Sequence, residues 1–100
     1  MRVRFTPQAE RQYLDGLRYA RRRNPAGAVT VQRRAEAVIA LLREHPDAGH
    51  AIPEFPELPH RELPVPPYSF FHRVVAGTVW IVAVWHGRQL PGSPEGVPQG

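Results

Sequence analysis

The pattern of hydrophobic and polar residues divides the chain into two halves of different character. Residues 1–5 alternate, with Val3 and Phe5 on one side and arginines on the other, which predicts a half-buried strand. Two stretches of helical periodicity follow, and beyond residue 45 the pattern changes to short apolar runs interrupted by prolines. The first half therefore predicts strand, helix, helix, and the second half predicts strands.

Two similar start signals mark the helices. Thr6-Pro7 and Asn24-Pro25 each place a capping side chain before a proline, whose missing N–H is not needed at the first helical position. The first helix gathers apolar residues on one arc, namely Ala9, Tyr13, Leu17 and Ala20. The opposite arc carries Arg11, Arg18, Arg21 and Arg22. The second helix has an apolar stripe of Ala28, Val31, Ala35, Val38, Ile39 and Leu42 and should end before Pro46. The short turn between the helices predicts an antiparallel hairpin.

The second half predicts three strands. Prolines crowd residues 46–67, and because proline cannot donate to a β-ladder, a strand at Arg61–Val65 should be an edge strand or an interrupted one. Residues 69–75 and 78–85 predict two longer strands joined by a tight turn at Ala76-Gly77. In the last strand Val79, Ile81, Ala83 and Trp85 alternate with Thr78, Trp80, Val82 and Val84. Both faces are apolar, so we expect it to be the central strand, with the helical hairpin on one side.

These elements predict one α+β domain over residues 1–90, in the order β-α-α-β-β-β. Its helical hairpin should pack on a mostly antiparallel sheet. Residues 91–100 are rich in proline and glycine without apolar periodicity, which predicts a disordered tail. A chain of 100 residues leaves little room for a second core.

The composition narrows the possible chemistry. The chain has no cysteine, which excludes disulfides and thiolate metal sites and is compatible with a cytoplasmic protein. Its N-terminus lacks the apolar run of a secretory signal, and the longest apolar stretch, residues 74–85, is too short to span a membrane. There is no glycine-rich phosphate loop, nucleophile elbow or strong metal-ligand spacing. We therefore expect no metal, no small-molecule cofactor and no membrane partner.

The charge points to a polyanion or an acidic protein as the partner. The net charge is +4, and every basic residue is an arginine. Residues 18–34 contain six arginines and no acidic residue. Such a cluster is either a solvated helix face or a surface that something acidic covers, because like charges on neighbouring turns repel. Tyr19 is the only aromatic residue within this cluster, so most of the stacking half of a single-strand nucleic-acid surface is missing along the sequence.

A second group of candidates lies on the predicted strands: Arg61, His72, Arg73, His86 and Arg88. Arg73 either pairs with Glu62 on an open sheet face or reaches phosphate or an acidic partner, which its planar guanidinium suits. His72 points to the other face and is expected to be a core histidine. His86 and Arg88 flank Gly87, which is either a simple strand end or a place where side chains converge on the surface.

The chain resembles the RelE/ParE superfamily, the toxins of bacterial type II toxin–antitoxin systems. The resemblance rests on the run RELPVPPYSFFHRVVAGTVWIVAVWHGRQ at residues 61–89: an arginine-led strand, a tyrosine and an aromatic-Arg-Val strand, a hairpin strand and a closing His-Gly-Arg. VRFTPQAERQYLDGLRYA, with the Asn-Pro that follows, is similar to the first strand and helix of the family. Together these motifs cover about residues 1–90.

The resemblance implies a growth-inhibiting toxin that is neutralised by a cognate antitoxin through an acidic, amphipathic segment. RelE-like members cleave mRNA on the ribosome with basic side chains of the sheet, whereas ParE-like members inhibit DNA gyrase and lack that set. At the matching positions a RelE-like enzyme would use Arg61, Arg73, His86 and Arg88 as its catalytic residues. RelE-like nucleases usually have a terminal tyrosine or histidine, and beyond Arg88 this chain has Gln89 and Leu90, which favours a ParE-like toxin.

Two alternatives to the gyrase inhibitor stay open at this point. His86 could supply the acid or base of a ribosome-dependent endonuclease, because the pKa of histidine lies near neutrality. The chain could also be a non-toxic, degenerate binding module. Contacts with the antitoxin or the target are expected at Arg11, Arg18, Arg21, Arg22, Arg73, Trp85 and Arg88.

Overall fold

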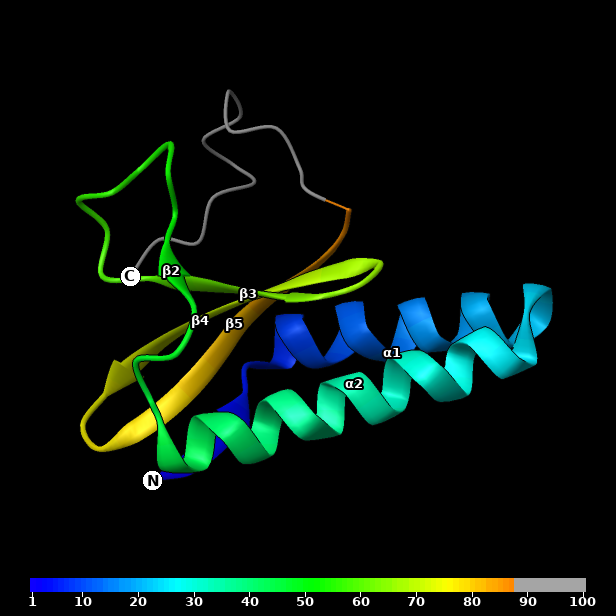
Figure 1. Ribbon diagram of the computed structural model, residues 1–100, viewed down its shortest axis with the longest axis horizontal. Coiled ribbons are helices and arrows are strands. Elements are labelled where there is room, and N and C mark those ends of the chain that lie inside the picture. The colour runs from blue at the N-terminus through cyan, green and yellow to red at the C-terminus, as the bar shows by residue number, and fades with distance from the viewer. Residues whose placement is uncertain (88–100) are drawn as a thin grey trace.

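The computed structural model describes residues 1–87, in which two helices pack on one face of a five-stranded sheet (Figure 1). The elements are β1 (Arg2–Phe5), α1 (Pro7–Arg23), α2 (Pro25–Glu44), β2 (His50–Ala51), β3 (Arg61–Val65), β4 (Tyr68–Val75) and β5 (Thr78–His86). The α+β class and the helical hairpin are as the sequence predicts, and β2 is an additional short strand. The predicted tail at residues 91–100 lies outside the described residues. No helix of residues 1–87 is long and apolar enough to cross a membrane.

Side-chain caps begin both helices at the predicted residues. Thr6 accepts a hydrogen bond from the Ala9 N–H at 3.2 Å, and Asn24 accepts one from the Gly27 N–H at 3.1 Å. The Asn24 N–H also donates to the Ala20 carbonyl at 2.7 Å, so this one residue ends α1 and begins α2. The turn of the hairpin is therefore a single residue long, and each cap stabilises its helix by about 1 kcal/mol.

The sheet has the strand order β1-β5-β4-β3-β2, with β1 parallel to β5 and every other pair antiparallel. The middle strand is β4, so the prediction that residues 78–85 form the central strand is wrong by one place. β5 lies between β1 and β4. A strand with two apolar faces is covered on both sides of the sheet, and this is true of both β4 and β5. The pattern does not show which strands pair with its two edges.

The position of Pro64 in β3 agrees with the prediction of an edge or interrupted strand. β2 pairs only with Arg61 and Glu62, so the outer edge of β3 is open at Pro64. The missing N–H of this proline therefore costs no ladder hydrogen bond on that edge.

The β4–β5 hairpin turns at Ala76 and Gly77, as the sequence predicts. Both residues have positive φ, 49° and 78°, which is the backbone of a two-residue turn whose twist matches the strands. Gly77 adopts this conformation without strain, and Ala76 adopts it at some cost.

A bulge in β5 changes which side chains face the helices. Phe71 pairs with Ala83 and the next residue, His72, pairs with Ile81, so Val82 has no partner in β4. Beyond the bulge the alternation is shifted by one residue. Val79, Ile81 and Val84 consequently belong to the core under the helices, and Ala83 and Trp85 face the opposite side. The uninterrupted alternation expected from the sequence is therefore wrong for the second half of this strand.

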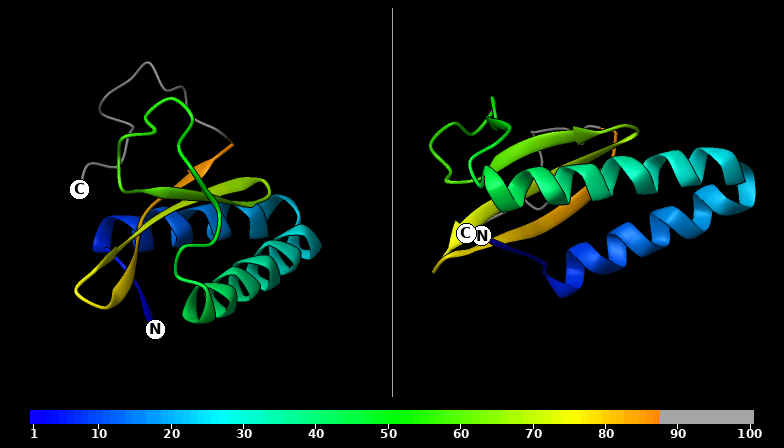
Figure 2. Two further views of the ribbon diagram at one scale, coloured as in Figure 1. Left: turned by 60° about the vertical axis from the view of Figure 1, so that its left-hand side comes forward. Right: turned by 60° about the horizontal axis from the view of Figure 1, so that its bottom comes forward.

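Apolar side chains cover both faces of the sheet. The main core lies between the sheet and the helical hairpin, where the rings of Phe5, Tyr13 and Phe70 pack with centroids 5.7–6.1 Å apart. A smaller core on the other face contains Ile52, Phe71 and Ala83. The segment between β2 and β3 covers this face, on the side of the sheet away from the helices (Figure 2).

Replacement of Ile81 by valine should lower the free energy of unfolding by about 1 kcal/mol, because it leaves a small cavity in the main core. Ile81 is fully buried, whereas Val29 on α2 is 48% exposed. Val29→Ala should therefore change the free energy of unfolding by less than about 0.5 kcal/mol. Urea titrations followed by circular dichroism measure both values, and equal losses would contradict the burial of Ile81 in the main core.

Candidate functional site

The face of α1 that points away from the core is strongly positive. It presents the predicted contact residues Arg11, Arg18, Arg21 and Arg22, all of them exposed. Arg18 pairs with Asp15 at 3.2 Å, but both side chains are more than half exposed, so the pair contributes little to stability. Leu14 is 41% exposed between these arginines. Helical spacing places Arg11, Leu14, Arg18 and Arg21 in one stripe, which we call the α1 stripe.

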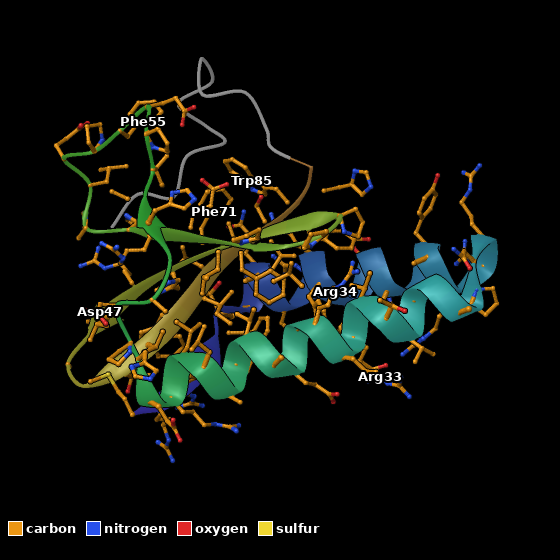
Figure 3. All side chains as sticks on the ribbon, viewed as in Figure 1. Arg33, Arg34, Asp47, Phe55, Phe71 and Trp85 are labelled. Atoms are coloured by element: carbon orange, nitrogen blue, oxygen red, sulfur yellow. The ribbon has the colours of Figure 1, made fainter. Side chains whose placement is uncertain are left out.

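Two further arginines connect the helices with neighbouring groups near the hairpin turn. The guanidinium of Arg23 donates to the Tyr19 hydroxyl and lies 5.0 Å from the centroid of the Tyr19 ring. Arg34 on α2 donates to the Pro66 carbonyl at 3.0 Å, which links α2 to the turn that leads into β4 (Figure 3). Arg23 is thus held beside an aromatic ring of α1, and Arg34 is held at the turn before β4.

The opposite face of the sheet carries Trp85, another predicted contact residue. Its ring packs on Phe71 with centroids 4.6 Å apart, and Phe55 lies against the same cluster (Figure 3). Trp85 is only partly buried. This outer face therefore presents an aromatic ring that is held in place by its neighbours.

Arg73 lies on the same outer face, at the other end of the strands. β3 and β4 pair Arg61 with His72, and one residue further this register sets His60 opposite Arg73. His60 is 1% exposed, and neither ring nitrogen has a hydrogen-bond partner among residues 1–87. Burial, followed by the positive charge of Arg73, holds the pKa of His60 below its usual range. Arg73 itself is partly buried, and its Nε also has no partner in the described part of the chain.

Arg61 and His72 lie on the helix side of the sheet, where they fasten the segment after α2. His72 is fully buried, as the sequence predicts for a core histidine, and its Nε2–H donates to the Ala48 carbonyl at 2.9 Å. The Arg61 guanidinium donates to the Gly49 carbonyl at 2.7 Å. Burial is the largest cause that lowers the pKa of His72. Within residues 1–87 no three His, Asp or Glu side chains are grouped so that they could hold a metal ion.

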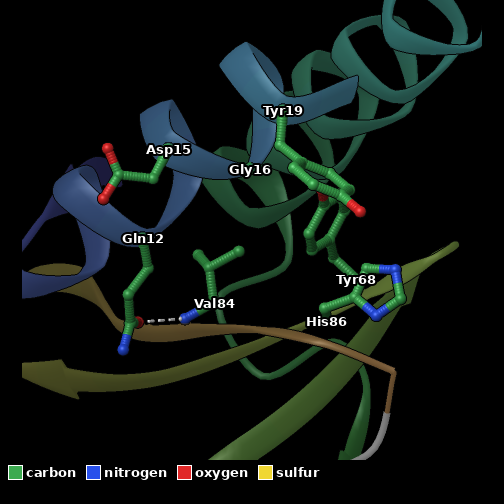
Figure 4. Close-up of a pocket in the computed structure, with 7 residues that line it drawn as sticks. All are labelled: Gln12, Asp15, Gly16, Tyr19, Tyr68, Val84 and His86. Carbon is green, nitrogen blue, oxygen red and sulfur yellow. Dashed lines mark hydrogen bonds between the residues drawn. The ribbon is translucent and has the colours of Figure 1, made fainter. Parts of the chain in front are cut away.

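A pocket of about 560 Å³ lies between α1 and the C-terminal end of β5 (Figure 4). It is lined by Gln12, Asp15, Gly16, Tyr19, Tyr68, Val84 and His86. The bulge in β5 creates the sheet side of this pocket, because it turns Val84 and His86 towards the helices. The rings of His86 and Tyr68 meet edge to face, with their centroids 5.4 Å apart.

Two contacts hold the walls of the pocket together. The Gln12 side-chain oxygen accepts a hydrogen bond from the Val84 N–H at 2.8 Å, which fastens α1 to β5 (Figure 4). Gly16 lets the Tyr68 ring lie against α1, because a Cβ there would come within 2.8 Å of the Tyr68 hydroxyl oxygen. Burial, with a smaller effect of Tyr19, raises the pKa of Tyr68. Its hydroxyl is therefore neutral at physiological pH and can both donate and accept a hydrogen bond.

The basic residues suggested for RelE-like catalysis do not come together. Arg61 and Arg73 lie on opposite faces of the sheet, since Arg61 pairs with His72 and Arg73 is the next residue. His86 pairs with Tyr68, five residues from Arg73 along β4, which corresponds to about 17 Å. Arg88 lies outside the described residues.

Sequence reasoning did not single out Gln12, Tyr19 or Tyr68. Gln12, Gly16 and Tyr19 have helical spacing, which places them on one side of the first helix, beside its apolar arc. This spacing is a signal in the sequence that the three residues share one surface. Nothing in the sequence indicates that Tyr68 and His86 lie next to this stripe, because the bulge that turns β5 leaves no clear mark.

Lowering the pH from about 7.5 to about 5.5 should lower the free energy of unfolding. The pKa values of His60 and His72 are depressed in the folded chain, so the unfolded chain takes up protons near pH 6.5 while the folded chain does not. Stability is therefore fully present above this pH and is lost below it, by at most about 1.4 kcal/mol per pH unit for each histidine. Urea titrations across this range measure the slope. His60→Leu should make it shallower, and an unchanged slope in this variant would contradict the assignment.

Comparisons with known proteins identify the family. The model of the ParE toxin of type II toxin–antitoxin systems, parDE, matches residues 3–91. Among solved structures, the chain is similar to one described as the chromosomal ParDE toxin–antitoxin system from P. aeruginosa, with a TM-score of 0.68 and 16% identity, covering 88% of this chain and 97% of that one. No curated protein matches the chain. The separate strand and helix motifs and the family match agree, and the chain belongs to the ParE toxin family of type II toxin–antitoxin systems.

Proposed function

We propose that this toxin inhibits DNA gyrase and that its antitoxin neutralises it by binding along the α1 stripe. The family supports a toxin with an antitoxin partner. The observation that carries the choice of gyrase over mRNA cleavage is the separation of Arg61, Arg73 and His86. Acid–base catalysis needs groups within hydrogen-bond reach of one reacting centre, and these three lie on two faces and at two ends of the sheet.

The α1 stripe suits an acidic, amphipathic antitoxin segment. Leu14 offers an apolar contact, and Arg11, Arg18 and Arg21 surround it with positive charge. An amphipathic helix laid along this stripe would bury Leu14 and bring its own acidic residues to the arginines. The excess positive charge would also speed the encounter with such a partner.

The outer face of the sheet suits contact with the target. Trp85 is held by Phe71 while part of its ring is accessible, and Arg73 lies on the same face. Tryptophan and arginine dominate the energetics of protein interfaces when neighbouring side chains hold them in place. Antitoxin and target would thus bind on opposite sides of the molecule.

The purified chain should inhibit the supercoiling of relaxed plasmid by DNA gyrase. Trp85→Ala should weaken this inhibition by about tenfold or more, because it removes the anchor of the proposed target contact. Arg33→Ala on the exposed side of α2 should leave the inhibition unchanged, and thermal unfolding checks that both variants fold. Undiminished supercoiling at high toxin excess, with new breaks in translated mRNA, would instead support a RelE-like nuclease.

Reversal of one charge in the α1 stripe should weaken antitoxin binding. Arg21→Glu should lower the affinity for the antitoxin by about tenfold and reduce rescue of growth when the two proteins are expressed together. Arg43→Glu makes the same change of charge at the far end of the helical hairpin and should have little effect. Equal losses in the two variants, measured by calorimetry, would show that only net charge matters and would contradict docking on the stripe.

A further inference from the structure

The pocket between α1 and β5 has no role in the proposed contacts with gyrase or antitoxin. It is an open hollow of about 560 Å³ that combines three aromatic rings with polar groups, and it is large enough for one planar base. We propose that it binds one unpaired base of a single-stranded nucleic acid, whose phosphates lie on the arginines beside it. This binding does not depend on inhibition of gyrase.

The aromatic rings provide stacking surfaces. Tyr19 is 55% exposed at the pocket, and Tyr68 and His86 meet edge to face on the sheet side (Figure 4). Bases stack on tyrosine and histidine rings in proteins that bind single strands, whatever the base. The exposed rings of Tyr19 on α1 and His86 on β5 therefore offer stacking surfaces, and the buried Tyr68 ring packs against His86.

Polar groups on the α1 wall suit the edge of a base. Gln12 uses its side-chain oxygen on the Val84 N–H, which leaves its amide N–H groups as donors. The Asp15 carboxylate lines the same pocket; its Oδ1 accepts from Arg18, and its other oxygen can accept from an exocyclic amino group. The α1 wall thus offers both donors and an acceptor to a base.

Three arginines lie near Tyr19. Arg23 is one helical turn beyond Tyr19 on the same side of α1 as Gln12 and Gly16, and its guanidinium lies against the Tyr19 ring. Arg22 follows on the adjoining exposed face of α1, and Arg34 approaches from α2 through the Pro66 carbonyl. All three side chains are exposed, so phosphates of a strand with one base in the pocket could reach them.

The rings of the pocket favour nucleic acid over an acidic peptide. Carboxylates would satisfy the arginines, but an acidic side chain has no ring to stack on the exposed rings of Tyr19 and His86. A nucleotide places a planar ring and an anionic group side by side, as this site does. The pocket would therefore hold the base of one nucleotide in a flexible strand, and the arginines would contact the phosphates of that strand.

The test is fluorescence anisotropy with short labelled oligo(dT) and oligo(U) and the full-length chain. Both probes should bind at about 50 mM salt, and their binding should weaken steeply by about 200 mM, since phosphate contacts release counterions.

Tyr19→Ala should weaken binding by about tenfold, which is within the range of a lost base stack, and Tyr19→Phe should restore it. Arg22→Ala should weaken binding and reduce the slope of log affinity against log salt by about 0.7. Comparison of oligo(U) with oligo(dU), which differ only in the 2′-hydroxyl, shows whether the site prefers RNA or DNA.

The matched control is Arg43→Ala, which removes the same charge at the far end of the hairpin and should leave binding nearly unchanged. Equal weakening by Arg22→Ala and Arg43→Ala, with no effect of Tyr19→Ala, would reduce the interaction to general charge attraction and overturn the proposal. Absence of binding at low salt would overturn it as well. The proposal would also be overturned if an acidic peptide bound in a way that depends on Tyr19 and the oligonucleotides did not bind.

Discussion

The organisation of both sheet faces depends on one unpaired residue in β5. Val82 has no partner in β4, and the side chains after it consequently change faces. Val84 and His86 then point towards α1, and Ala83 and Trp85 join Phe71 on the outer face. Without this bulge Trp85 would be directed towards the helices and His86 away from them.

The bulge therefore separates two surfaces with different chemistry. On the helix side it completes an aromatic pocket whose α1 wall is held to β5 by the hydrogen bond between Gln12 and Val84. On the outer side it provides an aromatic cluster covered in part by the segment that contains Ile52 and Phe55. Both surfaces carry arginine, which is why the net charge alone could not distinguish a nucleic-acid ligand from a protein partner.

Local signals in the sequence predicted the helices well, because each cap and each proline acts within a few residues. Thr6, Asn24 and Pro46 set the helix boundaries that the structure shows. The bulge at Val82, the two-residue β2 and the burial of His60 depend on contacts between distant segments, and no local pattern encodes them. For the same reason the sequence could name Arg61, Arg73 and His86 as candidates but could not show that two faces and two ends of the sheet separate them.

The single-residue turn at Asn24 joins α1 to α2, and the exposed surface of α1 carries two separate rows of side chains. The α1 stripe forms one row, and Gln12, Gly16, Tyr19 and Arg23 form the other. At about 100° per residue the centres of the two rows lie roughly 150° apart around the helix, with Asp15 and Arg22 between them. A ligand on one row therefore leaves the other row open, and a toxin held by its antitoxin along the α1 stripe would still present the row that lines the pocket.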